Sequence, residues 1–299
     1  MQISSVHRVI TLFAIATASL LVVSGFMVSE STGLPIPSWA QGGQALHRGV
    51  AGIVAASVLG LTVLAWRSAM DIRLKRLAAA LTGMVLLQAA LGLLLAKFGP
   101  LVQVSLFQAM LMHFLFAGAA ILFLSTRKPA AAAVERVEDE LSPSLRSIAW
   151  WPAMLVVGQI ALGSAYRHGL LGVMPHLMGA FVIAAALAFL GVLVATTYPG
   201  HRALKRTALS VVWLMALQIV LGLIALFYRA RVVESAVGEL PSPWWALLTV
   251  SHIVVGSITF AATVWMAVQI RKFVLPAALP ATGSHREAAP SIELRTRLS

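Results

Sequence analysis

The sequence of 299 residues contains no cysteine, which excludes a structural disulfide, a Cys-ligated zinc and an iron–sulfur cluster. Charged residues are scarce, at 11% against roughly 25% in a soluble domain, and 60% of the residues are hydrophobic. The apolar residues fall in runs of about 18 to 22, the length needed to cross a hydrocarbon core about 30 Å thick. An ordinary soluble protein is therefore excluded, and we predict an all-α integral membrane protein.

Eight transmembrane helices are predicted from these runs. The first follows Arg8 and has no convincing signal cleavage site before Glu30, so it is kept as a span. The predicted spans are Val9–Val28, His47–Trp66, Leu77–Ala96, Val104–Leu124, Ile148–Ala165, Leu171–Thr196, Thr207–Phe227 and Trp245–Ile270. They contain no aspartate or glutamate, which argues against a proton-driven pump, because such pumps relay protons through membrane carboxylates.

The formal net charge is +12, and most of the 22 lysine and arginine residues fall in loops on one side of the predicted helices. Basic loops mark the cytoplasmic side of a membrane protein. We therefore predict that both termini are cytoplasmic and that the chain lies in the lipid of a bacterial-type inner (cytoplasmic) membrane. The positive charge is a topology signal and requires no nucleic acid as a partner.

The chain contains an internal repeat with an offset of about 130 residues. Gln88-Ala-Ala-Leu-Gly92 recurs as Gln218-Ile-Val-Leu-Gly222, and Gln159-Ile-Ala-Leu-Gly163 opens the second half. Two homologous four-helix bundles are predicted, related by an axis along the membrane normal. The predicted organisation is an N-terminal half at residues 1–127, a linker at 128–147, a C-terminal half at 148–272 and a cytoplasmic tail at 273–299. The acidic linker is predicted to be a solvated tether.

One histidine lies on each even-numbered span: His47, His113, His176 and His252. Each falls within roughly the first ten residues of its span, so all four lie within about 15 Å of the outer surface. An ionisable side chain in a membrane is costly and marks function by default. Zinc usually takes three or four converging ligands, including carboxylates or thiols that these helices lack. Two histidines per half suit the two axial positions of a haem iron held within a four-helix bundle.

A glycine follows each of these histidines by about one turn: Gly52, Gly118, Gly179 and Gly256. This spacing either leaves space for a porphyrin or serves helix packing. Arg48, Arg167 and His168 lie near the same face and are candidates to pair with haem propionates, because arginine forks suit carboxylates. Interfacial anchoring is the alternative for these residues.

At these residues the chain resembles the heme A synthase family. The matching segments are Gly33–Trp39 (GLPIPSW), Gln44–Arg48 (QALHR), and Leu162–His168 (LGSAYRH) followed by Pro175-His176. Members of that family have eight helices in two homologous halves, with a histidine on each even-numbered helix. The topology and the repeat extend the resemblance over both predicted halves, excluding the linker.

The resemblance implies an enzyme that oxidises the C8 methyl of heme O to a formyl group, which makes heme A for terminal oxidase assembly. It assigns His47 and His113 to the substrate heme O. It assigns His176 and His252 to the iron of a cofactor haem b in the second half. The implied partners are an external electron donor, a heme O synthase and terminal oxidase assembly factors.

One position departs from the family pattern. The family usually has a glutamate, implicated in catalysis, three residues before the first histidine, and this chain has Gln44. Glutamine forms hydrogen bonds but cannot exchange a proton as a carboxylate does. Gln44 stays a catalytic candidate beside His47 and His113. Two other functions stay open: a non-catalytic haem-binding assembly factor or carrier, and a di-haem membrane cytochrome b that transfers electrons.

Overall fold

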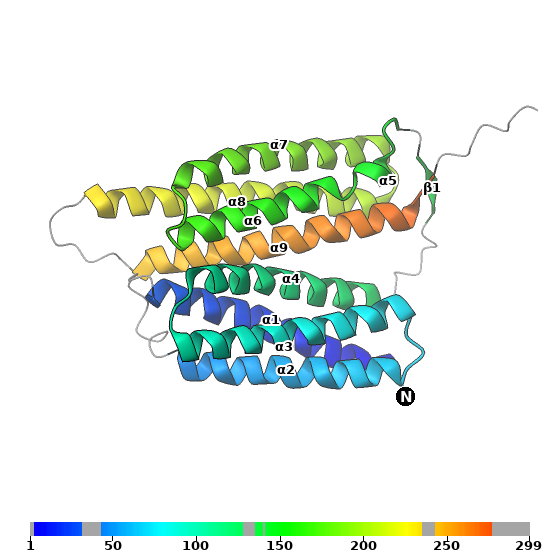
Figure 1. Ribbon diagram of the computed structural model, residues 1–299. Helices are drawn as coiled ribbons and strands as arrows, with labels where there is room; N and C mark the ends of the chain where they lie inside the picture. Colours follow the sequence, from blue (N-terminus) through cyan, green and yellow to red (C-terminus); the bar gives the residue numbers. More distant parts are fainter. Residues whose placement is uncertain (1–2, 32–42, 128–134, 140, 235–242, 277–299) are drawn as a thin grey trace, which may run out of the picture.

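The fold is almost entirely helical (Figure 1). The computed structural model describes residues 3–31, 43–127, 135–139, 141–234 and 243–276; the motif at 33–39 and the residues after 276 lie outside this part. Its elements are α1 (Ile3–Ser31), α2 (Gln44–Trp66), α3 (Ile72–Phe98), α4 (Val102–Thr126), β1 (Val137–Glu138), α5 (Leu145–Ile148), α6 (Trp151–Arg167), α7 (Val173–Thr197), α8 (Arg202–Glu234), α9 (Pro243–Phe273) and β2 (Val274–Leu275). Over the described residues, eight helical segments are long and apolar enough to cross a membrane. The predicted all-α, multi-pass membrane fold is confirmed.

The fifth predicted span is interrupted near its beginning. α5 ends at Ile148, and α6 starts at Trp151 with Pro152 in its first turn. A proline ring clashes with the carbonyl four residues earlier, which here belongs to Ile148, so one helix cannot run through this point. Proline is tolerated in the first turn of a new helix, because the N–H there has no helical partner.

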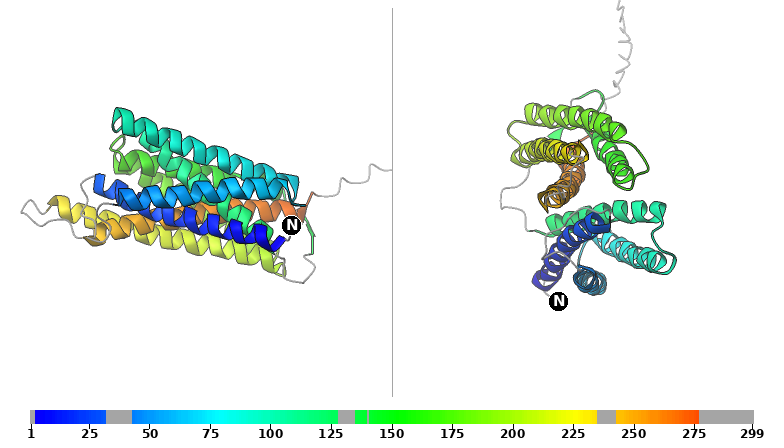
Figure 2. Two further views of the ribbon diagram at one scale, coloured as in Figure 1. Left: turned by 90° about the horizontal axis from the view of Figure 1, so that it is seen from below. Right: turned by 90° about the vertical axis from the view of Figure 1, so that its left-hand side faces the viewer.

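The long helices pack as two groups (Figure 2). In the first group α1 contacts α2 and α4, and α3 contacts α2 and α4. In the second group α7 contacts α6 and α8, and α9 contacts α6 and α8. Helix α9 joins the groups, because it also packs against α4 and α1. The homology of the two halves and the domain boundaries remain predictions.

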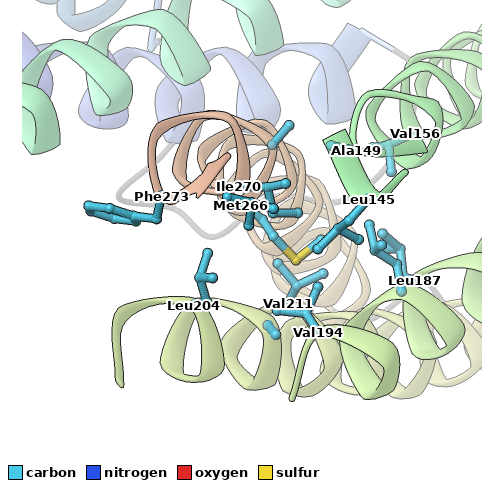
Figure 3. Packing of buried hydrophobic residues seen from close by; sticks show 14 of the residues in the cluster. Leu145, Ala149, Val156, Leu187, Val194, Leu204, Val211, Met266, Ile270 and Phe273 are labelled. Atoms are coloured by element: carbon cyan, nitrogen blue, oxygen red, sulfur yellow. The ribbon is translucent and has the colours of Figure 1, made fainter. Parts of the chain in front are cut away.

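Each group has its own cluster of buried hydrophobic side chains. The cluster of the second group includes Leu145, Leu187, Leu204 and Met266 (Figure 3). Large apolar side chains also cover the outside of the helices; Phe181 is 73% exposed. Such a surface suits lipid, since hydrocarbon solvates apolar side chains and the backbone hydrogen bonds are satisfied within the helices.

The four helices that carry the predicted site histidines begin at the same end of the molecule. In Figure 1, α2, α4, α7 and α9 all start at the left, whereas the N-terminus and β1 lie at the right. His47 and His176 lie close to the starts of α2 and α7. His113 and His252 lie about three turns into α4 and α9. All four therefore lie towards the end of the molecule that we predict to be the outer face.

The described part of the linker is folded against the second group of helices. Its strand β1 pairs in parallel with β2, directly after α9. Asp139 is 1% exposed, and its carboxylate accepts hydrogen bonds of 3.1 to 3.3 Å from the backbone N–H groups of Leu141, Leu145 and Arg146. The predicted solvated tether is therefore wrong for these residues. An acidic run in a sequence does not reveal that one of its carboxylates meets three backbone donors.

We expect Asp139→Asn to lower the free energy of unfolding by about 1–3 kcal/mol, because an amide NH₂ would face a buried backbone donor. Thermal unfolding in mild detergent, followed by circular dichroism, measures the change. Glu138→Gln is the matched control, since Glu138 is adjacent and exposed. Equal melting temperatures for the two variants would show that the Asp139 carboxylate does not stabilise the linker.

Candidate functional site

Two histidines of the second helix group face each other. The imidazole rings of His176 on α7 and His252 on α9 have centroids 6.3 Å apart and planes 80° apart. The ring of Tyr166 on α6 lies nearly parallel to that of His176, with the centroids 6.5 Å apart. The structure thus brings these two predicted ligands together, while their binding of iron remains a prediction.

Gln218 on α8 contacts both ring nitrogens of His252. The Nδ1 atom lies 3.1 Å from the backbone carbonyl of Gln218, and Nε2 lies 3.1 Å from its side-chain Nε2. A carbonyl oxygen only accepts, so Nδ1 carries the proton and donates, and Nε2 accepts from the amide. His252 is therefore a neutral imidazole with its lone pair on Nε2, which is a form that binds metals.

Gln159 on α6 contacts His176 through its side-chain amide and also through its backbone. Its Nε2 donates to the backbone carbonyl of His176 at 2.8 Å and lies 3.1 Å from Nδ1 of the ring. The side chain and the backbone of Gln159 therefore both hold the ring of His176 against α6.

Glycines allow the glutamine-bearing helices to approach the imidazole rings closely. A Cβ added to Gly163 would lie 2.9 Å from Cε1 of His176, and a Cβ added to Gly222 would lie 2.8 Å from Cε1 of His252. Real Cβ atoms essentially never come so close to another heavy atom. Each of these two histidines therefore packs directly against the glycine of a Gln-x-x-x-Gly segment on the preceding helix.

The glycines that follow the histidines do not share one role. The glutamines of the facing helices cover Gly179 and Gly256, and the side chain of Leu81 covers Gly118. At Gly52, in contrast, no heavy atom lies within 4 Å of an added Cβ. Gly118, Gly179 and Gly256 therefore serve helix packing, which was one of the two interpretations of this spacing.

An open hollow of about 470 Å³ lies beside the start of α2. Three predicted site residues line it: Gln44, His47 and Arg48. Its other lining residues come from α1 and from the α3–α4 hairpin: Met27, Leu95, Ala96, Pro100 and Ser105. None of these described lining residues is a carboxylate. The hollow therefore offers an imidazole, an amide and a guanidinium, but no acid–base carboxylate.

His113 is not among the residues that line this hollow. Its Nδ1 donates to the backbone carbonyl of Ala109, one turn earlier on α4, at 2.8 Å. No ring contact joins His113 to His47, although both lie in the described part of the chain. The structure therefore does not bring the first predicted pair together as it does the second.

Arg167, at the end of α6, joins the two helix groups. Its Nη2 donates to the carbonyl of Gly25 and to Oγ of Ser29 on α1, both at 3.0 Å. Its positive charge also acts on His113 and His252, one histidine of each predicted pair. The eight spanning segments of the described chain contain no carboxylate to balance this charge. Arg167 thus connects the groups, and its pairing with haem propionates remains a prediction.

His168 follows α6 directly and has a buried Nε2 with no hydrogen-bond partner. Burial and the neighbouring Arg167 lower the pKa of His168 below its ordinary value, so the ring is neutral at pH 7. A neutral imidazole donates one hydrogen bond to a carboxylate without adding an ion pair. The predicted contact between His168 and a propionate would therefore be weaker than that of Arg167.

The donor atoms of the site limit which metal centre it can hold. Among the described residues, no group of three or more His, Cys, Asp or Glu side chains could hold a metal ion. Two facing imidazoles fit an iron porphyrin, because the macrocycle supplies the remaining ligands.

Residues 44–175 match the model of the COX15-CtaA family, which is described as cytochrome oxidase assembly protein. These residues are similar to that family. The matched part of the chain includes Gln44, His47 and His113 and ends just before His176. No curated protein matches the chain. The family predicted from the sequence is confirmed, and the match supports a role in cytochrome oxidase assembly.

From the sequence, Gln159 and Gln218 were identified only as members of the internal repeat. The structure shows that each contacts a histidine of the facing pair. The sequence does contain a signal for this. Each glutamine lies on the helix that precedes a histidine-bearing helix, four residues before a glycine. This spacing places the glutamine and its glycine on the same face of the helix.

Proposed function

We propose that this chain is a heme A synthase-like membrane oxidoreductase, which converts the C8 methyl of heme O to a formyl group for terminal oxidase assembly. The facing pair His176 and His252, with ring centroids 6.3 Å apart, carries the proposal. Two imidazoles that bind one metal from opposite sides, each through a bond of about 2 Å, have centroids about 6 Å apart. The pair could therefore hold one haem iron between its rings, and the family match supports a role in cytochrome oxidase assembly.

His176 and His252 would hold the cofactor haem b, which, when bound, supplies electron transfer from an external donor. The hydrogen bond from Nδ1 of His252 to the carbonyl of Gln218 holds the ring in place, and Nε2 would bind the metal once the side-chain amide of Gln218 has moved away from it. Arg167 and His168, at the end of α6, are the candidates for its propionates. All of these side chains lie near one end of the second helix group.

The substrate heme O is assigned to the first helix group. Arg48, beside the hollow, offers a guanidinium fork suited to a propionate, and His47 offers an imidazole to the iron. His113 is the second candidate ligand, from further along α4. Gln44 can donate or accept a hydrogen bond at the reacting side of the substrate, but it cannot take up the proton that the oxidation releases.

Co-expression with a heme O synthase, followed by solvent extraction and chromatography of the haems, tests the reaction. We expect heme A in cells that express both chains and none in cells that lack this chain. Oxygen is the expected oxidant, so heme A should not form under anaerobic growth. Haem b alone in a fully loaded protein would contradict the synthase assignment.

A non-catalytic haem carrier is the second candidate, because Gln44 lines a hollow without a carboxylate among its described residues. A carrier would retain heme O unchanged in the same extraction. It would also release that haem to an acceptor protein without any change in the porphyrin.

We expect Gln44→Glu to raise the rate of heme A formation by on the order of 10²-fold, because a carboxylate can exchange a proton with the reacting group. The rate is measured by haem chromatography at equal protein levels. Gln103→Glu is the control, since Gln103 is exposed near the start of α4 and does not line the hollow. An equal or lower rate with Gln44→Glu would mean that another group moves the proton.

A further inference from the structure

The first helix group contains a pair of glutamines that the proposed function does not use. Nε2 of Gln88 on α3 donates to the backbone carbonyl of Gln108 on α4 at 3.0 Å, and Nε2 of Gln108 donates to the backbone carbonyl of Gln88 at 3.4 Å. A carbonyl oxygen only accepts, so each amide is oriented with its nitrogen towards the other helix. Within the described chain, the Oε1 atoms of both side chains are left without a hydrogen bond.

This pair takes a place that a histidine takes in the second helix group. There, Nδ1 of His252 meets the backbone carbonyl of Gln218, which is the counterpart of Gln88 in the repeat. In the first group the side chain of Gln108 meets the corresponding carbonyl. When the repeat is aligned at the histidines of α4 and α9, Gln108 corresponds to the apolar Leu247. The amide pair therefore belongs to the helix group assigned to heme O, and the repeated fold does not require it.

The helix faces that carry the pair begin at the hollow beside the start of α2. On α3, Leu95 lines the hollow, and Gln88 lies two turns before it on the same face. On α4, Ser105 lines the hollow, and Gln108 follows it by one turn on the same face. A short turn at the predicted outer end joins α3 to α4. Both glutamines therefore lie further into the membrane than the hollow, by about 5–10 Å along the helices.

Of the two side chains, Gln108 is the better placed to reach a molecule in the hollow. It lies one turn from the lining and passes over Gly92, where an added Cβ would lie 3.6 Å from its Nε2. Gln88 lies a turn deeper, and its Nε2 also contacts Sδ of Met112 at 4.0 Å. The carbonyl of Gln88 holds the amide of Gln108, so the Oε1 of Gln108 is a fixed acceptor.

We propose that Gln108 determines specificity for heme O by accepting a hydrogen bond from its hydroxyl group, an inference that rests on the proposed function. Heme O differs from haem b in an isoprenoid chain that carries this hydroxyl beside the macrocycle, at the edge away from the propionates. Arg48, at the hollow, is the candidate for a propionate, which points the opposite edge inward between α3 and α4. Haem b has no hydroxyl to offer there.

The hydrogen bond gives a preference without disturbing the packing of α3 against α4. The amide nitrogens stay on the backbone carbonyls, and only the unused Oε1 of Gln108 accepts. A hydroxyl that leaves water for an apolar site loses free energy unless it finds an acceptor. A site with a hydrogen-bonding group for a substrate hydroxyl therefore disfavours the analogue that lacks it.

The experiment uses the full-length protein purified with its haem b and measures its affinity for added heme O and added haem b by difference absorbance. Methionine is unbranched and flexible like glutamine but has no amide. We expect Gln108→Met to weaken heme O binding by about 3- to 10-fold, the value of one neutral hydrogen bond, and to leave haem b binding unchanged.

Gln88→Met is the matched comparator, because it keeps the backbone carbonyl that holds Gln108. We expect it to retain the preference for heme O. Gln103→Met, at an exposed position of α4, should alter neither affinity. An equal loss of both haems in Gln108→Met indicates a packing role and overturns the proposal, and so does the same loss of preference in Gln88→Met.

A measurement on the unmodified protein decides the case in which Gln108→Met does not fold. Acetylation of the heme O hydroxyl removes its proton and leaves the protein unchanged. We expect acetylated heme O to bind less tightly than heme O, and equal binding would overturn the proposal. Failure of the unmodified protein to bind any heme O beside its haem b is a separate result, because it contradicts the proposed function itself.

Discussion

Replacing His252 by alanine is expected to abolish the low-spin haem spectrum of the second helix group. In the described part of the chain, His252 and His176 are the two imidazoles that meet there, and both would be needed to hold a low-spin haem. Gln218 also contacts both ring nitrogens of His252. Another histidine could therefore take its place only if α8 formed new contacts with that histidine. The absorbance spectrum and the haem content per mole of protein measure the loss.

His7→Ala is the control for this experiment. His7 also lies on a spanning helix, but at the other end of the molecule, where it stacks on Phe123 and contacts Thr126. We expect its haem spectrum to be unchanged. The His252 variant should also melt at a lower temperature than the loaded protein, because bound haem stabilises the folded state by mass action. An unchanged spectrum in His252→Ala would reject the ligand assignment.

Adding a single methyl group at Gly163 is expected to displace His176 and to remove most of the haem. The new Cβ would lie 2.9 Å from Cε1 and 3.2 Å from Nδ1 of the ring, so the imidazole must move away from α6. Overpacking of this kind costs about 1–3 kcal/mol. Gly163→Ala therefore combines a lower melting temperature with loss of the low-spin spectrum.

Gly158→Ala is the matched control on the same helix. No heavy atom lies within 4 Å of a Cβ added there, and alanine favours a helix over glycine by up to about 1 kcal/mol. We expect this variant to keep its haem and to melt at the same or a higher temperature. If both variants keep their haem equally, the ring of His176 does not depend on its contact with Gly163.

The spanning helices could be predicted because their signal is local. The span His47–Trp66, for example, ends at the same residue as α2, since both follow from the apolar run and the polar residues after it. The break before Trp151 was not predicted, although Pro152 is visible in the sequence, because the surrounding residues are apolar enough to hide it. The contacts of Asp139 were not predictable, since its three donors become neighbours only when the linker folds back.

The histidine positions and the pairing of His176 with His252 could be predicted, but the separation of His113 from His47 could not. His176 lies on α7 and His252 lies on α9. Both helices pack against α8, and the two imidazole rings face each other. His113 instead turns to the carbonyl of Ala109 on its own helix. The rotation of a helix about its axis decides whether its histidine faces another histidine or its own backbone. A sequence of small and apolar residues constrains that rotation only weakly.

The sequence alone determined that this is a multi-pass membrane protein with a histidine on each even-numbered span and with a resemblance to the COX15-CtaA family over residues 44–175. Hydrophobic length, residue order and sequence similarity are properties of the chain itself. The tertiary structure decided which imidazoles face each other, that Gln159 and Gln218 hold them, and that Arg167 of one helix group reaches α1 of the other. These contacts depend on how closely helices approach and how each is rotated. Both are set by packing between segments far apart in the chain, as where Gly163 meets His176 and Gly222 meets His252.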